Sequence, residues 1–304
     1  MLLVIEQLLN GLQLGITLFL MAAGLTLVFG IMQVINLAHG SFYMIGAYVG
    51  ATVAAHTGSF LLAMLAAVGA AALVGCVVEI LVLRHLYRRQ HLDQVLATFG
   101  LIMFFNELIR IVWGRQPLFM NVPAGLNKSI ELLPGLPYPT YRLVVIAVGL
   151  LVALFLWLMF AKTKVGMQIR AGSSNREMIG ALGVNINLLY TLVFGLGALL
   201  AGLAGVMAGP ILAVEPGMGE SILILTFVVI VIGGIGSIRG AVAGALLVGM
   251  VDTLGRAFLP SLLRTILATA TADSVAASLS SMAIYILMAA ILVWKPRGLF
   301  PAHG

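Results

Sequence analysis

The chain of 304 residues has very little charge: Asp, Glu, Lys and Arg make up 9% of it, whereas 62% of its residues are hydrophobic. Soluble domains carry about 25% charged residues, so this chain has too little polar surface to stay in water. Its apolar runs of about 20 residues are long enough for helices to cross a bilayer, and helices satisfy their own backbone hydrogen bonds in lipid. The composition therefore indicates a helical integral membrane protein.

Several other features are absent. The single cysteine, Cys76, lies in an apolar segment, so no disulfide framework is expected. No Gly-Lys-Ser/Thr triplet closes a phosphate-binding loop, so the chain is not expected to hydrolyse ATP. No His or Cys pair has metal-ligand spacing and no nucleophile–base pair stands out, so we expect neither a metal site nor an enzyme. No Lys or Arg precedes the first apolar run, which contains Glu6, so a cleavable signal peptide is not expected.

The apolar segments predict an all-α fold: a polytopic transmembrane helix bundle of eight or nine spans with Gly-rich broken segments, forming a single domain over residues 1–304. Two of the segments are short and rich in glycine, which leaves the span count open. The expected spans are 3–30, 41–57, 60–83, 94–113, 141–161, 188–208, 221–235, 241–258 and 276–294.

Basic residues predict the orientation. The formal net charge is +6, and the basic clusters at 84–89, 162–176 and 295–297 fall on one side when the spans alternate. The positive-inside rule makes that side cytoplasmic and places the C-terminus there. The positive charge is thus explained by topology, and nucleic-acid binding is not expected. On the opposite side, the loop at about 114–140 contains five prolines and is expected to be extended and rich in turns.

Charged residues inside the spans are expected to be paired or to reach the surface, because an isolated charge in lipid is costly. Glu79 lies near the cytoplasmic end of its span and is expected to extend towards that surface. The other pairings follow from helical spacings of three and four residues. The expected pairs are Glu107 or Asn106 with Arg110, and Asp252 with Arg256.

The stretch "LLAGLAGVMAGP" at 199–210 is almost free of large side chains and predicts unusually close helix packing. Pro210 is expected to end this helix. The residues that follow, 209–220, predict a re-entrant or outer-surface turn. Glu215 and Glu220 flank "PGMG" in this turn and are expected to be hydrated.

The stretch "INLAHGSFYMIG" at 35–46 interrupts the apolar pattern with Asn36, His39, Gly40 and Ser41. One interpretation is a wet cytoplasmic turn in which Asn36 or Ser41 caps the next helix. The other is a broken helix that lines a conduit, with its freed backbone groups facing a water-filled cavity. The chemistry of these residues leaves both interpretations open.

A short amphipathic helix is predicted between Val165 and Gly183 on the cytoplasmic side, with Gly183 as its C-terminal stop. Such a helix indicates docking to another protein, or contact with the membrane surface. Its polar face carries Arg170, Ser173, Ser174 and Arg176 or Glu177, and its apolar face carries Met167, Ala171, Met178 and Leu182.

Three separated motifs occur together: "GLTLVFGIMQVINLAHGSFYMIGAY", "RAGSSNREMIGALGVN" and "GGIGSIRGAVAGALLVG". With them, and with the tail "WKPRGLF", the chain resembles the LivH-type permease subunit of branched-chain amino acid ABC importers from about Leu8 to Pro301. The resemblance implies a pore made with a second permease subunit, two ABC ATPase subunits that bind a cytoplasmic coupling segment at about 162–187, and a periplasmic substrate-binding protein. It implies no cofactor on this chain, since ATP is bound by the partner subunits.

The resemblance also assigns residues. It places Arg170, Ala171, Asn175, Arg176 and Gly183 in the coupling segment, and Asn36, His39, Gly40 and Ser41 near the substrate pathway.

The chain departs from the family pattern at Gly180, which should weaken the coupling helix. Relatives with the first signature that import urea or short amides carry a longer N-terminal region, which favours a hydrophobic amino acid here. Three alternatives stay open: a urea or short-amide permease, an ion-coupled secondary transporter with an essential unpaired carboxylate, and a channel-like or structural membrane protein.

Overall fold

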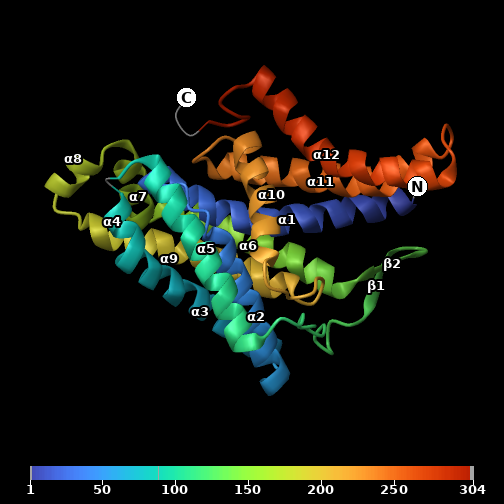
Figure 1. The fold of residues 1–304 in the computed structure, drawn as a ribbon, viewed down its shortest axis with the longest axis horizontal. Helices are drawn as coiled ribbons and strands as arrows, with labels where there is room; N and C mark the ends of the chain where they lie inside the picture. The colour runs from blue at the N-terminus through green and yellow to red at the C-terminus, as the bar shows by residue number, and fades with distance from the viewer. Residues whose placement is uncertain (1, 88, 302–304) are drawn as a thin grey trace. The chain divides into compact units, whose positions relative to one another are not determined.

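The structure, a computed structural model, describes residues 2–87 and 89–301, without the side chain of Arg176. Each of the nine predicted spans corresponds to a helix, and the predicted all-α membrane bundle is confirmed (Figure 1). These helices are α1 (Leu2–Met32), α2 (His39–Thr57), α3 (Phe60–Val78), α5 (His91–Trp113), α6 (Thr140–Lys162), α9 (Ile186–Ala208), α10 (Met218–Gly233), α11 (Ile238–Leu263) and α12 (Thr269–Trp294).

Within the described residues, seven helical segments are long and apolar enough to cross a membrane. The second of them continues from α3 through a π-helical turn, η1 (Glu79–Leu83), into the short α4 (Arg84–Leu86). The helix α10 is shorter, at 16 residues, and α2 is not among the seven, so the predicted count of eight or nine is approximate. Many large apolar side chains lie exposed on these helices, among them Leu73, Ile111 and Leu151, as expected for surfaces that face lipid.

The chain forms two compact units, which are described separately; the first comprises residues 20–123 and 150–225. Its core is the packing of α2, α3 and α9 against one another (Figure 1). A Cβ atom at Gly46 would collide with the backbone of Gly202, and one at Gly205 would collide with the carbonyl oxygen of Tyr43. The predicted close packing of 199–210 is therefore confirmed, because glycine lets these backbones touch.

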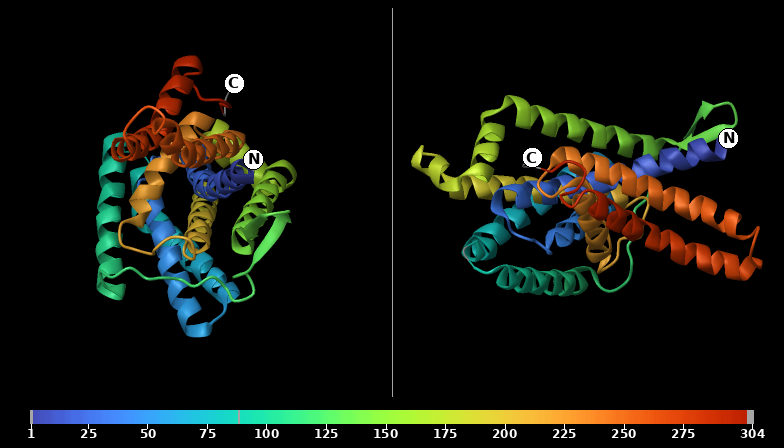
Figure 2. Two further views of the ribbon diagram at one scale, coloured as in Figure 1. Left: turned by 90° about the vertical axis from the view of Figure 1, so that its right-hand side faces the viewer. Right: turned by 90° about the horizontal axis from the view of Figure 1, so that it is seen from above.

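The second unit comprises residues 1–19, 124–149 and 226–304. Here α11 packs against both α12 and the first part of α1, and the right-hand view in Figure 2 shows α11 and α12 side by side. A Cβ at Gly15 would lie 2.9 Å from the carbonyl oxygen of Ala245. The approach at Gly249 is closer still, since a Cβ there would lie 2.5 Å from the carbonyl oxygen of Gly11.

The loop predicted at 114–140 contains no α-helix before Thr140 in the described residues, as its prolines indicate. It includes a two-stranded antiparallel hairpin, β1 (Ser129–Leu133) and β2 (Leu136–Pro139), which is a small addition to the predicted all-α fold. The hairpin lies beside the N-terminal part of α1 (Figure 2), where the Tyr138 hydroxyl donates a hydrogen bond of 3.2 Å to Asn10.

Candidate functional site

The break between α1 and α2 is buried. Gln33 has φ +54°, in the left-handed region that residues other than glycine seldom adopt, and α2 begins six positions later at His39. Asn36 and His39 are 0% exposed and Ser41 is 3% exposed. The interpretation as a wet surface turn is therefore wrong, because water does not reach these side chains. Neither Asn36 nor Ser41 caps α2; the Asn36 side chain accepts instead from the backbone N–H of Ala38, at 3.0 Å.

His39 is held in the interior by a gap that glycine provides. Its Nε2 lies 3.3 Å from the carbonyl oxygen of Met21, and a Cβ at Gly24 would lie 3.0 Å from the imidazole ring. The Nδ1 of His39 and the side-chain nitrogen of Asn36 are buried without a hydrogen-bond partner among the described residues. Such groups lower the stability of the fold by about 1–3 kcal/mol each. The break therefore keeps polar side chains that reduce the stability of the protein.

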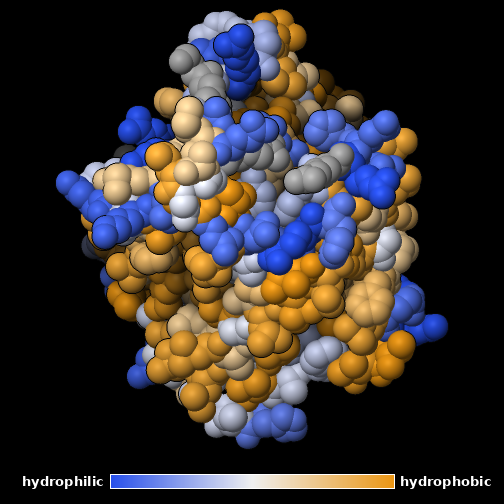
Figure 3. Space-filling model, turned by 90° about the vertical axis from the view of Figure 1, so that its left-hand side faces the viewer, coloured by the Kyte–Doolittle hydropathy of each residue, from blue (hydrophilic) through white to orange (hydrophobic). Residues whose placement is uncertain are grey.

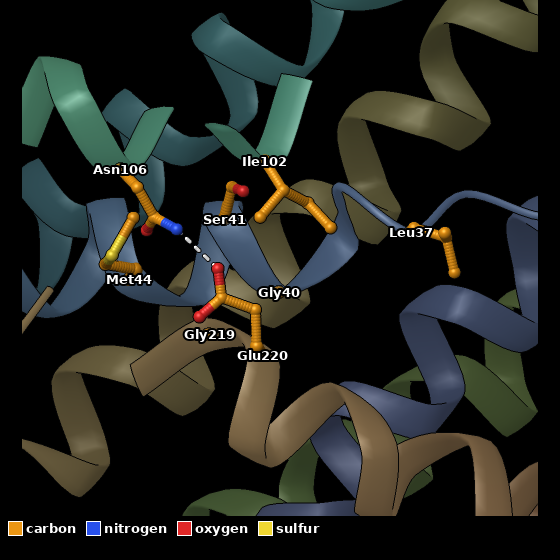
Figure 4. A pocket seen from close by; sticks show the side chains of 8 residues that line it. All are labelled: Leu37, Gly40, Ser41, Met44, Ile102, Asn106, Gly219 and Glu220. Carbon is orange, nitrogen blue, oxygen red and sulfur yellow. Dashed lines mark hydrogen bonds between the residues drawn. The ribbon is translucent and has the colours of Figure 1, made fainter. Parts of the chain in front are cut away.

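A narrow pocket, closed to a water-sized molecule in this structure, adjoins the break (Figure 4). Of the four predicted pathway residues, Gly40 and Ser41 line it, whereas Asn36 and His39 do not. Its role in a substrate pathway stays a prediction. The lining is Leu37, Gly40, Ser41 and Met44 from the break and α2, Ile102 and Asn106 from α5, and Gly219 and Glu220 from α10.

The first turns of α2 and α10 meet at this pocket. A Cβ at Gly40 would collide with the carbonyl oxygen of Gly219, and a Cβ at Gly219 would collide with that of Gly40. Strict alternation of nine spans places these two turns on opposite sides of the membrane. Because the two turns touch, they cannot lie on opposite sides, so strict alternation of nine spans does not hold. The arrangement of short helices around a buried break is of the kind that the broken-helix interpretation requires, and its water-filled conduit stays a prediction.

Glu220 is the pocket residue whose place the sequence did not reveal. The Asn106 amide donates a hydrogen bond to its carboxylate, and Figure 4 shows the two side chains facing each other. The prediction that Asn106 pairs with Arg110 is wrong, because Arg110 binds Glu107 at 2.5 Å. Glu220 is predicted to lie in a turn, but it is a half-buried residue in the first turn of α10 against α5.

Other carboxylates are paired. Asp252 binds Arg256 at 3.0 Å, as the spacing predicts. Glu79 is 0% exposed, so the expectation that it extends to the surface is wrong. It accepts hydrogen bonds from Arg84 at 3.0 Å and from two hydroxyl groups, those of Tyr87 and Thr191, at 2.9 and 2.6 Å. Among the described residues no cluster of three or more His, Cys, Asp or Glu is placed to hold a metal ion.

The predicted coupling helix is two helices, α7 (Lys164–Ser174) and α8 (Arg176–Ala181). The prediction of one continuous helix over 165–183 is wrong because Asn175 is extended and caps the second helix, its side chain accepting from the N–H of Met178 at 2.9 Å. Gly183 follows α8 with φ +86°, in agreement with its predicted role as a stop.

The surface of α7 and α8 combines charge with exposed apolar groups. Arg170 donates a hydrogen bond to the carbonyl oxygen of Phe160, which holds α7 against the end of α6. Ala171 is exposed, and the side chain of Arg176 lies outside the described residues. Met178 and Leu182 are 61% and 76% exposed. Figure 3 shows the side of the molecule towards which α8 projects, where hydrophilic side chains form a band above a hydrophobic surface.

A bundle of apolar helices, joined through glycine contacts and interrupted by a buried polar break, is the architecture of a membrane transport protein. Comparison with known proteins gives the family. The model of the family described as "Branched-chain amino acid transport system / permease component" matches residues 7–292. The chain belongs to this family and is a membrane-spanning permease component.

Individual relatives agree with this assignment. The chain is 33% identical over 263 residues to the high-affinity branched-chain amino acid transport system permease protein BraD of Pseudomonas aeruginosa, covering 83% of this chain and 86% of the relative. It is 30% identical over 269 residues to the corresponding LivH protein of Escherichia coli K12, covering 84% and 87%. A probable LivH protein of Methanocaldococcus jannaschii is 30% identical over 258 residues, covering 80% and 78%. No solved structure matches the chain.

Proposed function

We propose that this chain is the permease subunit of an ATP-driven importer that carries branched-chain or other hydrophobic amino acids across the bacterial inner membrane, with its C-terminus in the cytoplasm. Its partners are a second permease subunit, two ABC ATPase subunits and a periplasmic binding protein. Membership of the permease family supports the transport role, and the names of the relatives support the substrate class.

The observation that carries the ATP-driven mechanism is the exposed surface of α7 and α8. A surface helix pair that exposes Met178 and Leu182 beside charged groups is suited to bind a soluble protein. The segment is followed, after Gly183, by α9, which is part of the packed core. Movement of a bound ATPase would therefore reach the bundle through α9. This chain supplies the path for the substrate, and ATP is hydrolysed on the partner subunits.

An ion-coupled carrier is the alternative function, and Glu220 is the observation that favours it, because no cation pairs with this carboxylate among the described residues. The carboxylates of Glu79, Glu107 and Asp252 do not meet this requirement, because each has an arginine partner. A urea or short-amide permease differs only in substrate.

The first test is to purify the chain gently and identify the proteins that accompany it by mass spectrometry. Stoichiometric ATPase subunits and a second permease subunit are expected. Next, Leu182→Ser should reduce uptake per ATP hydrolysed in the reconstituted complex without changing thermal stability, because Leu182 is 76% exposed. Val293→Ser, which alters an 87% exposed residue near the end of α12, is the matched control. Transport by the chain alone, without ATP, would contradict the proposal.

A further inference from the structure

The pocket between α2, α5 and α10 contains a carboxylate without a positive partner. Glu220 accepts one neutral hydrogen bond, from Asn106, and none of the salt bridges in the described part of the chain includes it. Glu215, five residues earlier, lies by a separate pocket with Arg110 and Arg115. An acidic group inside a membrane protein normally has a partner or a function. The Glu220 carboxylate is therefore available to bind a cation.

The other polar groups at the pocket are donors. Ser41 is 3% exposed and lines the pocket, and its hydroxyl forms no hydrogen bond within the described residues. The Asn106 amide is the second donor. The first turns of α2 and α10 also meet here, and helix N-termini carry partial positive charge that favours an anion. The pocket thus offers one acceptor for a cation and a donor set for an anion.

The remaining lining is apolar. Leu37, Met44 and Ile102 contribute to the pocket from the break, α2 and α5 (Figure 4). These side chains supply a hydrocarbon wall next to the polar groups. The pocket is closed in this structure and holds no space for a water-sized molecule, so a ligand can bind only when α2, α5 and α10 separate. A small molecule with a cation, an anion and a short apolar tail matches this combination.

We propose that this pocket is a binding site for the transported amino acid, in which Glu220 accepts hydrogen bonds from the ammonium group. Ser41 and Asn106 donate to the substrate carboxylate, and the aliphatic side chain lies along Leu37, Met44 and Ile102. This proposal rests on the proposed function and adds to it the residue that recognises the amino group.

The hydrogen bond between Asn106 and Glu220 explains how the empty site is kept closed. It satisfies the carboxylate with a neutral amide donor while no substrate is bound. An ammonium group brings a full positive charge to the carboxylate, which the neutral amide of Asn106 does not, so an arriving ammonium group displaces the amide from Glu220. The released Asn106 amide is then free to donate to the substrate carboxylate. A ligand without an amino group lacks the charge that drives this exchange.

The test uses the complete complex in proteoliposomes, with radiolabelled leucine delivered by the binding protein. Glu220→Gln keeps the size of the side chain and removes its charge. Because a hydrogen bond to a charged group contributes about 1.5–3 kcal/mol, uptake should fall at least about tenfold, while ATP hydrolysis stimulated by the binding protein stays within about twofold of wild type. Glu131→Gln, at an exposed residue of β1, is the matched control and should change neither rate.

Leucine uptake by Glu220→Gln within about twofold of wild type overturns this proposal but leaves the proposed function intact. Uptake by the wild type that is driven by a pH gradient without ATP, and is lost in Glu220→Gln, makes Glu220 a proton carrier and overturns both. If the Gln variant does not assemble, Glu220→Asp replaces it: a raised KM for leucine with unchanged ATP hydrolysis supports the proposal, and an unchanged KM overturns it.

Discussion

The buried carboxylate of Glu79 allows a quantitative prediction. Glu79→Gln removes the negative charge from a group that is 0% exposed and leaves the Arg84 guanidinium without its ion-pair partner, which lay 3.0 Å away. Removing one member of a buried pair typically costs 3–5 kcal/mol. Because the side chain of Arg84 is 32% exposed, water solvates part of the orphaned charge, and we expect the lower end, about 3 kcal/mol.

The measurement is the melting temperature of the purified chain in detergent, followed by fluorescence. Glu79 lies in the unit formed by residues 20–123 and 150–225. For a unit of this size, a loss of about 3 kcal/mol corresponds to a decrease in melting temperature of about 6–12 °C. The matched control is Asp273→Asn, which removes the ion pair with Arg264, whose two side chains are 44% and 51% exposed. Exposed pairs contribute about 0–1 kcal/mol, so the control should melt within about 4 °C of wild type.

A second comparison separates burial of charge from loss of shape. In the double variant Glu79→Leu with Arg84→Leu no charge is left unpaired, so part of the lost stability should return. If Glu79→Gln and Asp273→Asn lower the melting temperature equally, the reasoning that burial makes the Glu79 pair important is refuted.

Two further predictions concern backbone contacts and caps. Gly46→Ala should lower the melting temperature and broaden the gel-filtration peak, because the added Cβ meets the backbone of Gly202. The control Gly100→Ala lies in α5 with open space around it and should be neutral or stabilising by about 0.5–1 kcal/mol. Equal effects of the two variants would contradict the packing argument. Asn175→Ala removes the acceptor that caps α8 and should weaken that helix by about 1 kcal/mol, which should lower the ATP hydrolysis stimulated by the binding protein. Asn175→Asp keeps an acceptor and should retain this stimulated hydrolysis. Identical behaviour of the two variants would refute a capping role.

Much of the fold is readable from the sequence because its signal is local. A run of about 20 apolar residues specifies a membrane helix regardless of what surrounds it, and the spacing of Asp252 and Arg256 on one helix specifies their pairing. The glycine-rich stretch at 199–210 predicts close contact with some helix. It does not say which one, since the partner Gly46 is far away in the chain.

The wrong predictions have two physical causes. The bond between Asn106 and Glu220 joins residues 114 positions apart, and no local pattern announces such a contact. Asn106 also had a local candidate in Arg110, which instead bound the charged Glu107. The break at Asn175 was a different case. Its signal, an Asn with an acidic residue two positions later, is a recognised helix start, but the amphipathic periodicity across 165–183 concealed it.

The glycine contacts along α9 restrict how this permease can move. With 23 residues, α9 is a rod of about 34 Å, and its backbone interlocks with that of α2 at Gly202 and Gly205. Interlocked backbones cannot slide past each other, so we expect α2 and α9 to move together as one rigid body. The pivots are then outside the rod, at Gly183 and Gly217, both in the left-handed region. Gly183 adjoins α8 and Gly217 adjoins α10, so a rotation of this pair of helices would be accommodated next to both α8 and α10.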